Sequence, residues 1–431
     1  MQSLTKEDVL NQAKEYNVKF IRLQFSDILG VLRNTAITVE ELPKALEGFV
    51  TCDSSVVDTA VHDYKREVRL LPDPASFVVF PWRPREGAVA RLICDVTNED
   101  GTPYHCCSRT ILRQAIGETE ALGLRVMLET KNKFYLFKTD ENSRPTTVSH
   151  DQAGYFALFP SDLGENVRRD MVLTLEEMGL EVLASHHEVG PGQHEICLKY
   201  DNALAMADKL TTFRFVVRTI ASRHNLHASF MPQPMNNLPS SGLRIFQTVY
   251  RGLNNIFMGE NQQPSGEALS YVAGLLEHYP AFLPVTNPLI NSYKRLYTGA
   301  HKPTLAGWSY HRRDTIVRLP LNKGERTGIE IRNPDSACNP YLAFALLIKA
   351  GLAGLTKKLT PPPPLEEISP RIPRLPANLG EALSLLKTDS FFGQSVGEGL
   401  AAQYLTTKEQ EWTRFNQQVH PWEVEEYLQN F

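Results

Sequence analysis

Long apolar runs are missing from this 431-residue chain. No segment reaches the roughly 18 uncharged apolar residues that a membrane-spanning helix needs, because the longest candidate, 341–355, is interrupted by Lys349. The opening residues MQSLTKEDVLNQAKEY lack the apolar stretch of a signal peptide. They instead predict a polar helix capped by Thr5, with Asp8 three residues further on. We therefore expect a cytoplasmic protein without a membrane partner.

Cysteine and excess charge are also scarce. The six cysteines are scattered and show no CxxC spacing, which favours reduced thiols over a disulfide framework or a zinc site. A formal net charge of −4 gives no basis for binding nucleic acid. What is present is an ordinary globular composition, 42% hydrophobic and 22% charged, with enough apolar material for a large core.

The predicted elements divide the chain near residue 100. Four strands and one helix predict a small sheet domain over 1–100, which ends in the loop sequence NEDGTP. Longer helices and strands are mixed over 101–431, and seven prolines in 360–376 predict a stiff extended linker. Strands are predicted at 18–25, 31–37, 77–82, 88–96, 125–138, 180–189, 194–199, 227–231, 315–320 and 328–332. Helices are predicted at 109–122, 167–178, 202–223, 267–278, 339–355 and 379–386.

The densest group of chemically active residue types is SHHEVGPGQHEI, which starts at Ser185. It reads as a strand, a Gly/Pro turn and a second strand, so Glu188 and Glu195 could face one site. Carboxylates that face each other repel unless a cation lies between them. The spacing alone leaves two interpretations open, a cation site or a solvated sheet edge with unrelated charges.

The same motif closely resembles the signature of type I glutamine synthetases. Six further segments resemble that family in the correct order and nearly from end to end: IRLQFSDILG, GYFALFPSDLGENVRRD, NSYKRL, RTGIEIR, NPYLA and QVHPWEVEEY. The resemblance implies an α+β fold, with an N-terminal β-grasp domain and a C-terminal catalytic-type domain of a curved antiparallel sheet and helices. It also implies active sites between neighbouring subunits and a dodecamer of two hexameric rings. In that family, ATP phosphorylates glutamate and ammonia displaces the phosphate, while two divalent ions neutralise the developing charge.

Six positions of the family hold those ions, and three of them carry cations in this chain. The resemblance assigns the retained ligand positions to Glu188, Glu195 and Glu330. The lost positions are Lys131, Lys133 and Arg244. Ammonium and guanidinium groups cannot coordinate a metal ion, and three cations balance three carboxylates. We therefore expect a metal-free salt-bridge cluster, unless a two-residue shift brings Glu129 into a ligand position at the expense of the FYLF match.

Other positions of the resemblance are retained or altered. Asp53 matches the aspartate of the ammonium site, whereas His301 replaces the acid of the active-site flap and Pro239 replaces a substrate-binding asparagine. The resemblance gives catalytic-equivalent roles to Asp53, Arg313 and His301. It gives substrate- or phosphate-binding roles to Arg295, Arg318 and Arg332. The alternative for these arginines is a purely structural role in interfaces and salt bridges.

The altered ligands favour a glutamine synthetase-like pseudoenzyme that makes no glutamine and needs no cofactor. It would act by assembly, with an active glutamine synthetase paralogue or a nitrogen regulator as partner. The alternative is an ATP-dependent γ-glutamyl or other carboxylate–amine ligase with altered substrate and metal use, which would bind ATP with magnesium or manganese. A third hypothesis is a metabolite sensor that uses the arginines as an anion pocket.

Overall fold

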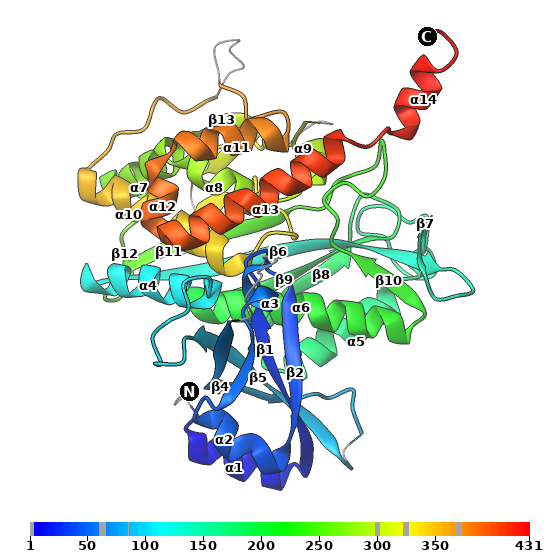
Figure 1. Ribbon diagram of the computed structural model, residues 1–431. Coiled ribbons are helices and arrows are strands. Elements are labelled where there is room, and N and C mark those ends of the chain that lie inside the picture. The colour runs from blue at the N-terminus through cyan, green and yellow to red at the C-terminus, as the bar shows by residue number, and fades with distance from the viewer. Residues whose placement is uncertain (1–3, 60–65, 85, 298–301, 322–326, 367–372) are drawn as a thin grey trace.

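A computed structural model describes the whole chain except residues 1–3, 60–65, 85, 298–301, 322–326 and 367–372. A small N-terminal domain lies beneath a larger domain, and the C-terminal helix α14 (Pro421–Tyr427) projects from the body (Figure 1). None of the described helices is long and apolar enough to cross a membrane. All six cysteines are free thiols, as the sequence predicts.

The N-terminal domain is the expected β-grasp fold. Its mixed sheet has the order β2-β1-β5-β4-β3, in which β1 and β5 run parallel. The first helix begins as predicted, because the Thr5 hydroxyl accepts from the Asp8 N–H while the Asp8 carboxylate accepts from the Thr5 N–H. The strands are β1 (Val18–Ser26), β2 (Leu32–Thr38), β3 (Val50–Asp53), β4 (Glu67–Val79) and β5 (Ala88–Thr97). The helices are α1 (Lys6–Glu15), η1 (Val39–Glu41), α2 (Leu42–Leu46) and α3 (Ser55–Asp58).

A second sheet forms the centre of the larger domain. Its main path has the order β13-β14-β15-β11-β6-β9-β8, while β7 and β10 pair with β6 and β12 pairs with β11. The prediction of an antiparallel sheet holds for every described pair except β13 and β14, which are parallel. The strands are β6 (Leu124–Thr139), β7 (Pro145–Ser149), β8 (Val182–His187), β9 (Gln193–Asn202), β10 (Leu226–Ser229), β11 (Leu243–Arg251), β12 (Asn254–Asn255), β13 (Leu305–Ser309), β14 (Thr315–Arg318) and β15 (Ile329–Ile331).

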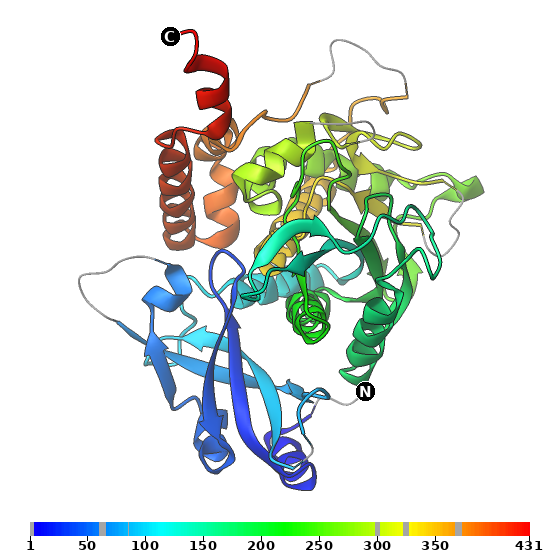
Figure 2. The same cartoon turned by 90° about the vertical axis from the view of Figure 1, so that its right-hand side faces the viewer.

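Helices surround this sheet (Figure 2), and the helix that follows β15 is largely buried. The sequence predicts this buried helix, and Asn339 caps it by accepting from the N–H groups of Tyr341 and Leu342. The helices are α4 (Ser108–Ala121), α5 (Glu165–Glu177), α6 (Ala203–Arg223), η2 (Glu260–Gln262), α7 (Gly266–Glu277), α8 (Tyr279–Thr286), α9 (Ile290–Tyr297), α10 (Pro340–Lys357), α11 (Leu379–Thr388), α12 (Ser390–Val396) and α13 (Glu398–Asn416).

One buried arginine joins the two domains. The Arg109 guanidinium on α4 lies 2.7 Å from Asp73 on β4 and 3.0 Å from Asp95 on β5. It also lies 2.8 Å from Asp208 on α6, so carboxylates of both domains share one cation. The β1–β2 turn contacts the other domain closely, because a Cβ on Gly30 would lie 2.6 Å from the Cα of Asn339. These contacts fix the position of the small domain on the large one.

Candidate active site

The residues singled out in the sequence meet where five neighbouring strands of the large sheet lie side by side. Lys133 on β6 is directly opposite Glu195 on β9, and Glu195 is opposite His186 on β8. On the other side of β6, Arg244 of β11 is opposite Lys131. The structure therefore places Lys133, and not Glu129, across from Glu195. Cross-strand neighbours have side chains within contact distance on the same face of a sheet.

Glu188 follows β8 and completes a compact group with His186 and Glu195. One ligand atom from each of the three lies within 4.8 Å of the others, and both glutamates are buried. Nε2 of His186 lies 3.4 Å from Glu188 and 3.9 Å from Glu195, and this buried atom has no hydrogen-bond partner among the described residues. Two carboxylates and an imidazole are ligand types that suit a divalent cation.

Two of the three unexpected cations contact this group. Nζ of Lys133 lies 2.7 Å from Glu188 and 3.9 Å from Glu195. Arg244 donates to Glu195 at 3.0 Å and lies 4.0 Å from Glu330. Lys131 makes no ion pair with a described carboxylate, although it pairs on the sheet with Arg244. The expected balance of three cations against three glutamates is therefore wrong for Lys131, because its side chain is outside the ion-paired group.

Glu330 on β15 is surrounded by guanidinium groups. Arg318 and Arg332 both form ion pairs with it, and Arg244 lies at its edge. Burial raises the pKa of Glu330, but the charges of these three arginines outweigh burial and lower the pKa below its usual value. The carboxylate is therefore held in its charged form. Its oxygens are thus occupied by protein cations. The residues fit one divalent ion at His186, Glu188 and Glu195, and they do not fit a second ion at Lys131, Arg244 and Glu330.

The charges around Glu188 also control its protonation. Burial alone raises the pKa of this carboxyl, but the contacts of His186 and Lys133 outweigh burial and lower the pKa from 4.5 to about 2. Glu188 is therefore ionised at neutral pH. An ionised carboxylate is the form that a metal ion or an ammonium binds.

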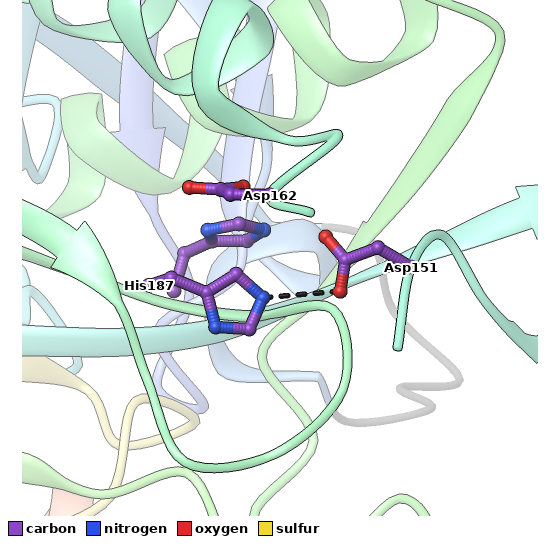
Figure 3. A group of neighbouring side chains, drawn as sticks. Asp151, Asp162 and His187 are labelled. Carbon is purple, nitrogen blue, oxygen red and sulfur yellow. Dashed lines mark hydrogen bonds and ion pairs between the residues drawn. The ribbon is translucent and has the colours of Figure 1, made fainter. Parts of the chain in front are cut away.

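A buried polar cluster supports the turn that carries Glu188 (Figure 3). Nδ1 of His187 contacts the Glu188 carbonyl at 2.7 Å, and Nε2 contacts Asp151 at 3.0 Å. Since both partners are acceptors, the imidazole donates from both nitrogens. Asp151 also accepts from the Gly192 N–H at 2.8 Å. The neighbouring Arg168 binds Asp162 at 2.8 Å and contacts His194 at 2.9 Å, so positive charge is already supplied by the protein here.

The other predicted site residues lie in different surroundings. Arg295 on α9 is buried and donates to the carbonyls of Arg332 and Asn333, so it holds the chain that follows β15. Burial lowers its pKa to about 10. Arg313 is exposed, and its carbonyl accepts from Arg332. Asp53 ends β3 in the N-terminal domain and accepts from the Ser55 N–H at 2.9 Å, whereas the three glutamates belong to the larger domain. His301 lies outside the described residues.

Sequence reasoning missed two residues of this region. His186 lies inside the recognised motif, and its alternation with Glu188 on one strand face was the available signal. Lys302 donates to Gln233 at 3.1 Å. Burial, and to a smaller extent the positive charge of Arg295, lowers the pKa of Lys302 to about 8. β11 was also missed, although LRIFQTVYR alternates in burial along its first residues as a half-buried strand does.

Comparisons with known proteins identify the family. The chain matches the family model described as "Glutamine synthetase, beta-Grasp domain" over residues 17–99 and "Glutamine synthetase, catalytic domain" over residues 105–427. It is 44% identical to the glutamine synthetase of Clostridium saccharobutylicum over all of both chains. Identity to the enzyme of Methanosarcina mazei is 42% over 98% of both chains, and to that of Thermus thermophilus 41% over 99% of both.

Solved structures agree with the sequence relatives. The structure titled "GmaS/ADP complex-Conformation 1" superposes with a TM-score of 0.89 at 26% identity, over 98% of this chain and 99% of that one. The structure titled "Apo GmaS without ligand" has the same TM-score at 25% identity and the same coverage. Members of this family are typically homo-oligomers.

These comparisons correct two expectations. The pseudoenzyme interpretation is wrong, because full-length relatives at 40–44% identity are glutamine synthetases, which indicates an enzyme. The expected association with nitrogen metabolism and with a ligase fold agrees with these relatives. The expectation of no cofactor is wrong as well, since enzymes of this family use ATP and divalent metals and a buried group of metal-ligand residues is present. Cations stand at three of the family's ligand positions, but His186 adds a donor beside Glu188 and Glu195. The chain belongs to the glutamine synthetase family.

Proposed function

We propose that this protein is an ATP-dependent carboxylate–amine ligase with altered metal use. The observation that carries the proposal is the juxtaposition of one metal-ligand group, His186, Glu188 and Glu195, with the cations Lys133 and Arg244. The reaction transfers the γ-phosphoryl group of ATP to a carboxylate oxygen. The amine nitrogen then forms a bond to the acyl carbon, the phosphate leaves, and the amine gives up a proton.

We assign the proposed roles of the site residues from their charges. When bound, a divalent ion at His186, Glu188 and Glu195 supplies charge neutralisation for the transferring phosphoryl group. Arg244, which contacts Glu195 and Glu330, supplies fixed positive charge on the side where the family has a second ion. Arg318 and Arg332, which form ion pairs with Glu330, add further positive charge that can bind phosphate. A divalent ion held by these three residues would take the place of Lys133 beside Glu188.

The substrate side of the site rests on the resemblance and stays a prediction. We propose that Asp53 of a neighbouring subunit accepts the amine proton and that Arg313 contacts the acyl phosphate. His301 is proposed to take the place of the flap acid, because imidazole exchanges protons near neutral pH. Arg295 is proposed to act on the substrate through the backbone that it holds. Glutamate is the first carboxylate to test, with ammonia and small primary amines as acceptors.

The decisive experiment measures phosphate release. Purified protein is incubated with ATP, glutamate and either ammonia or methylamine, with magnesium or manganese, and each component is omitted in turn. The proposal expects phosphate release that requires every component and an amide product. Phosphate release without an amine, or none with any amine under either metal, would contradict it.

An oligomeric assembly is part of the proposal. Support comes from apolar side chains that are exposed on the monomer, including Leu428 and Phe431 at the C-terminus and Phe156, Leu158 and Phe159 before α5. We propose a cytoplasmic homo-oligomer, a dodecamer of two hexameric rings, with a domain boundary near residue 100. Light scattering on the purified protein tests the number of subunits. An interaction with an active paralogue or a nitrogen regulator stays a prediction that co-purification can test.

A further inference from the structure

A large cavity lies between the two domains, separate from the glutamates of the candidate active site. Its volume is about 730 Å³, which falls in the range of small-molecule binding sites. Its walls come from β1 and the β1–β2 turn on one side and from α6 on the other. The chain just after β15 and the α13 helix close it. None of its lining residues belongs to the group that holds the proposed metal ion.

The charge of this cavity is strongly positive. Four arginines line it: Arg22, Arg83, Arg214 and Arg218. The one lining carboxylate, Glu411, forms an ion pair with Lys408. In the part of the chain that the structure describes, none of the four arginines forms an ion pair. Arg214 instead donates to the Cys338 carbonyl at 2.7 Å, and Arg22 donates to Asn34 at 3.4 Å. Guanidinium groups without carboxylate partners around a cavity favour an anionic ligand.

Aromatic rings also line this cavity. Phe80 and Trp82 stack with ring centroids 4.6 Å apart, and Phe215 meets the Trp82 ring edge-on at 5.5 Å. Arg218 lies over Phe230, with its Cζ atom 5.4 Å from the ring centroid. Trp82 is only half-buried, so its ring borders open space in the cavity. A surface of this kind binds planar rings by stacking.

We propose that this cavity is a second ligand site, which binds a small anion that carries a planar ring. The arginines bind its phosphate or carboxylate group, and the ring stacks against Trp82 and Phe215. Because residues of both domains line the cavity, the ligand contacts both at once. Ser336 and Ala337 also line it and lie a few residues after Arg332, so an occupied cavity is connected by the backbone to the arginines around Glu330.

Calorimetric titration of the full-length protein tests the site. Four probes are used: adenosine 5′-monophosphate, indole-3-acetate, inorganic phosphate and acetate. A non-hydrolysable ATP analogue with magnesium is kept in excess so that the ATP site is filled. We expect at least one ring-bearing anion to bind roughly tenfold more tightly than its ring-free counterpart. Preference for the monophosphate identifies a nucleotide-like ligand, and preference for indole-3-acetate identifies an aromatic carboxylate.

Three substitutions locate the binding. Arg218→Gln and Trp82→Leu are each expected to weaken the bound probe roughly tenfold, which corresponds to the loss of one good contact. Arg169→Gln on the neighbouring helix α5 is the control, because that side chain is 68% exposed and does not line the cavity. Arg22→Gln provides an independent test from the other domain. The proposal is overturned if no ring-bearing probe binds, or if binding is the same in Arg218→Gln, Arg22→Gln and the control.

Discussion

Nζ of Lys133 lies 2.7 Å from Oε1 of Glu188, so an ammonium group occupies a place where the family holds a metal ion. The contact neutralises a carboxylate that is almost fully buried. Burying a charge without a partner is costly, and the lysine removes that cost when no ion is bound. The site can therefore be folded and correctly arranged before any metal enters.

Replacing Lys133 tests this role, and Lys131 provides a matched control on the same strand. Lys133→Met leaves Glu188 short of positive charge and is expected to lower the free energy of unfolding by about 2 kcal/mol without metal. Lys131→Met should change it by less than about 0.5 kcal/mol, because Lys131 pairs with none of the three glutamates. Urea denaturation of metal-free protein measures both. Equal losses in the two variants would show that Lys133 has no special role.

His186 is expected to be a metal ligand. His186→Ala removes one of the three donors and should weaken manganese binding by at least roughly tenfold, as measured by isothermal titration. His224→Ala is the control, since that imidazole pairs with Asp170 at the surface. Manganese should stabilise the wild type and Lys133→Met against urea more than it stabilises His186→Ala. Unchanged affinity in His186→Ala would remove this histidine from the ligand set.

Acid should destabilise the protein through Glu188. Its pKa is about 2 in the folded protein and near 4.5 when unfolded, so its contribution is present above pH 4.5. The contribution is lost as the pH falls from about 4.5 to 2, because the unfolded chain then binds the proton more tightly. Urea midpoints between pH 5 and pH 3 should fall less steeply in Glu188→Gln than in the wild type. A parallel fall in both proteins would contradict the assignment.

The Asp151–His187 pair should stabilise the protein at low pH, and its contribution should be lost as the pH rises. Burial lowers the pKa of His187, but its contacts with Asp151 outweigh burial and raise the pKa above 6.5. The resulting stability is fully present below pH 6.5 and is lost as the pH rises through the folded pKa. Asp151→Asn should therefore cost more stability at pH 5.5 than at pH 8.5, as measured by urea denaturation at both values. Asp170→Asn, at the surface pair with His224, is the control and should show a smaller difference.

Much of the fold was predictable from sequence, because the patterns concerned are local. Thr5 and Asp8 marked the start of α1, and the apolar run after Asn339 marked a buried helix. The hairpin from Ser185 brought Glu188 and Glu195 together as its spacing indicated. The second half of the chain was harder, since α8 contains two prolines and β11 lies between buried neighbours.

The chemistry of the site was less predictable, because it depends on which side chains reach each other across strands. Cation identities suggested that Lys131, Lys133 and Arg244 were equivalent, yet only the last two reach a glutamate. Arg318 and Arg332 were expected to bind substrate anions, whereas both also bind Glu330. Sequence order cannot distinguish these outcomes. Strand register and side-chain length decide them.

The ion pairs of Arg109 with carboxylates of both domains affect how the protein unfolds. If the small domain detached alone, Asp73 and Asp95 would leave Arg109 with Asp208 only, and the arginine would be partly unpaired. Such a half-opened state is costly, so thermal melting should proceed as one cooperative transition instead of two. The chain then behaves as one thermodynamic unit, although it contains two separate sheets.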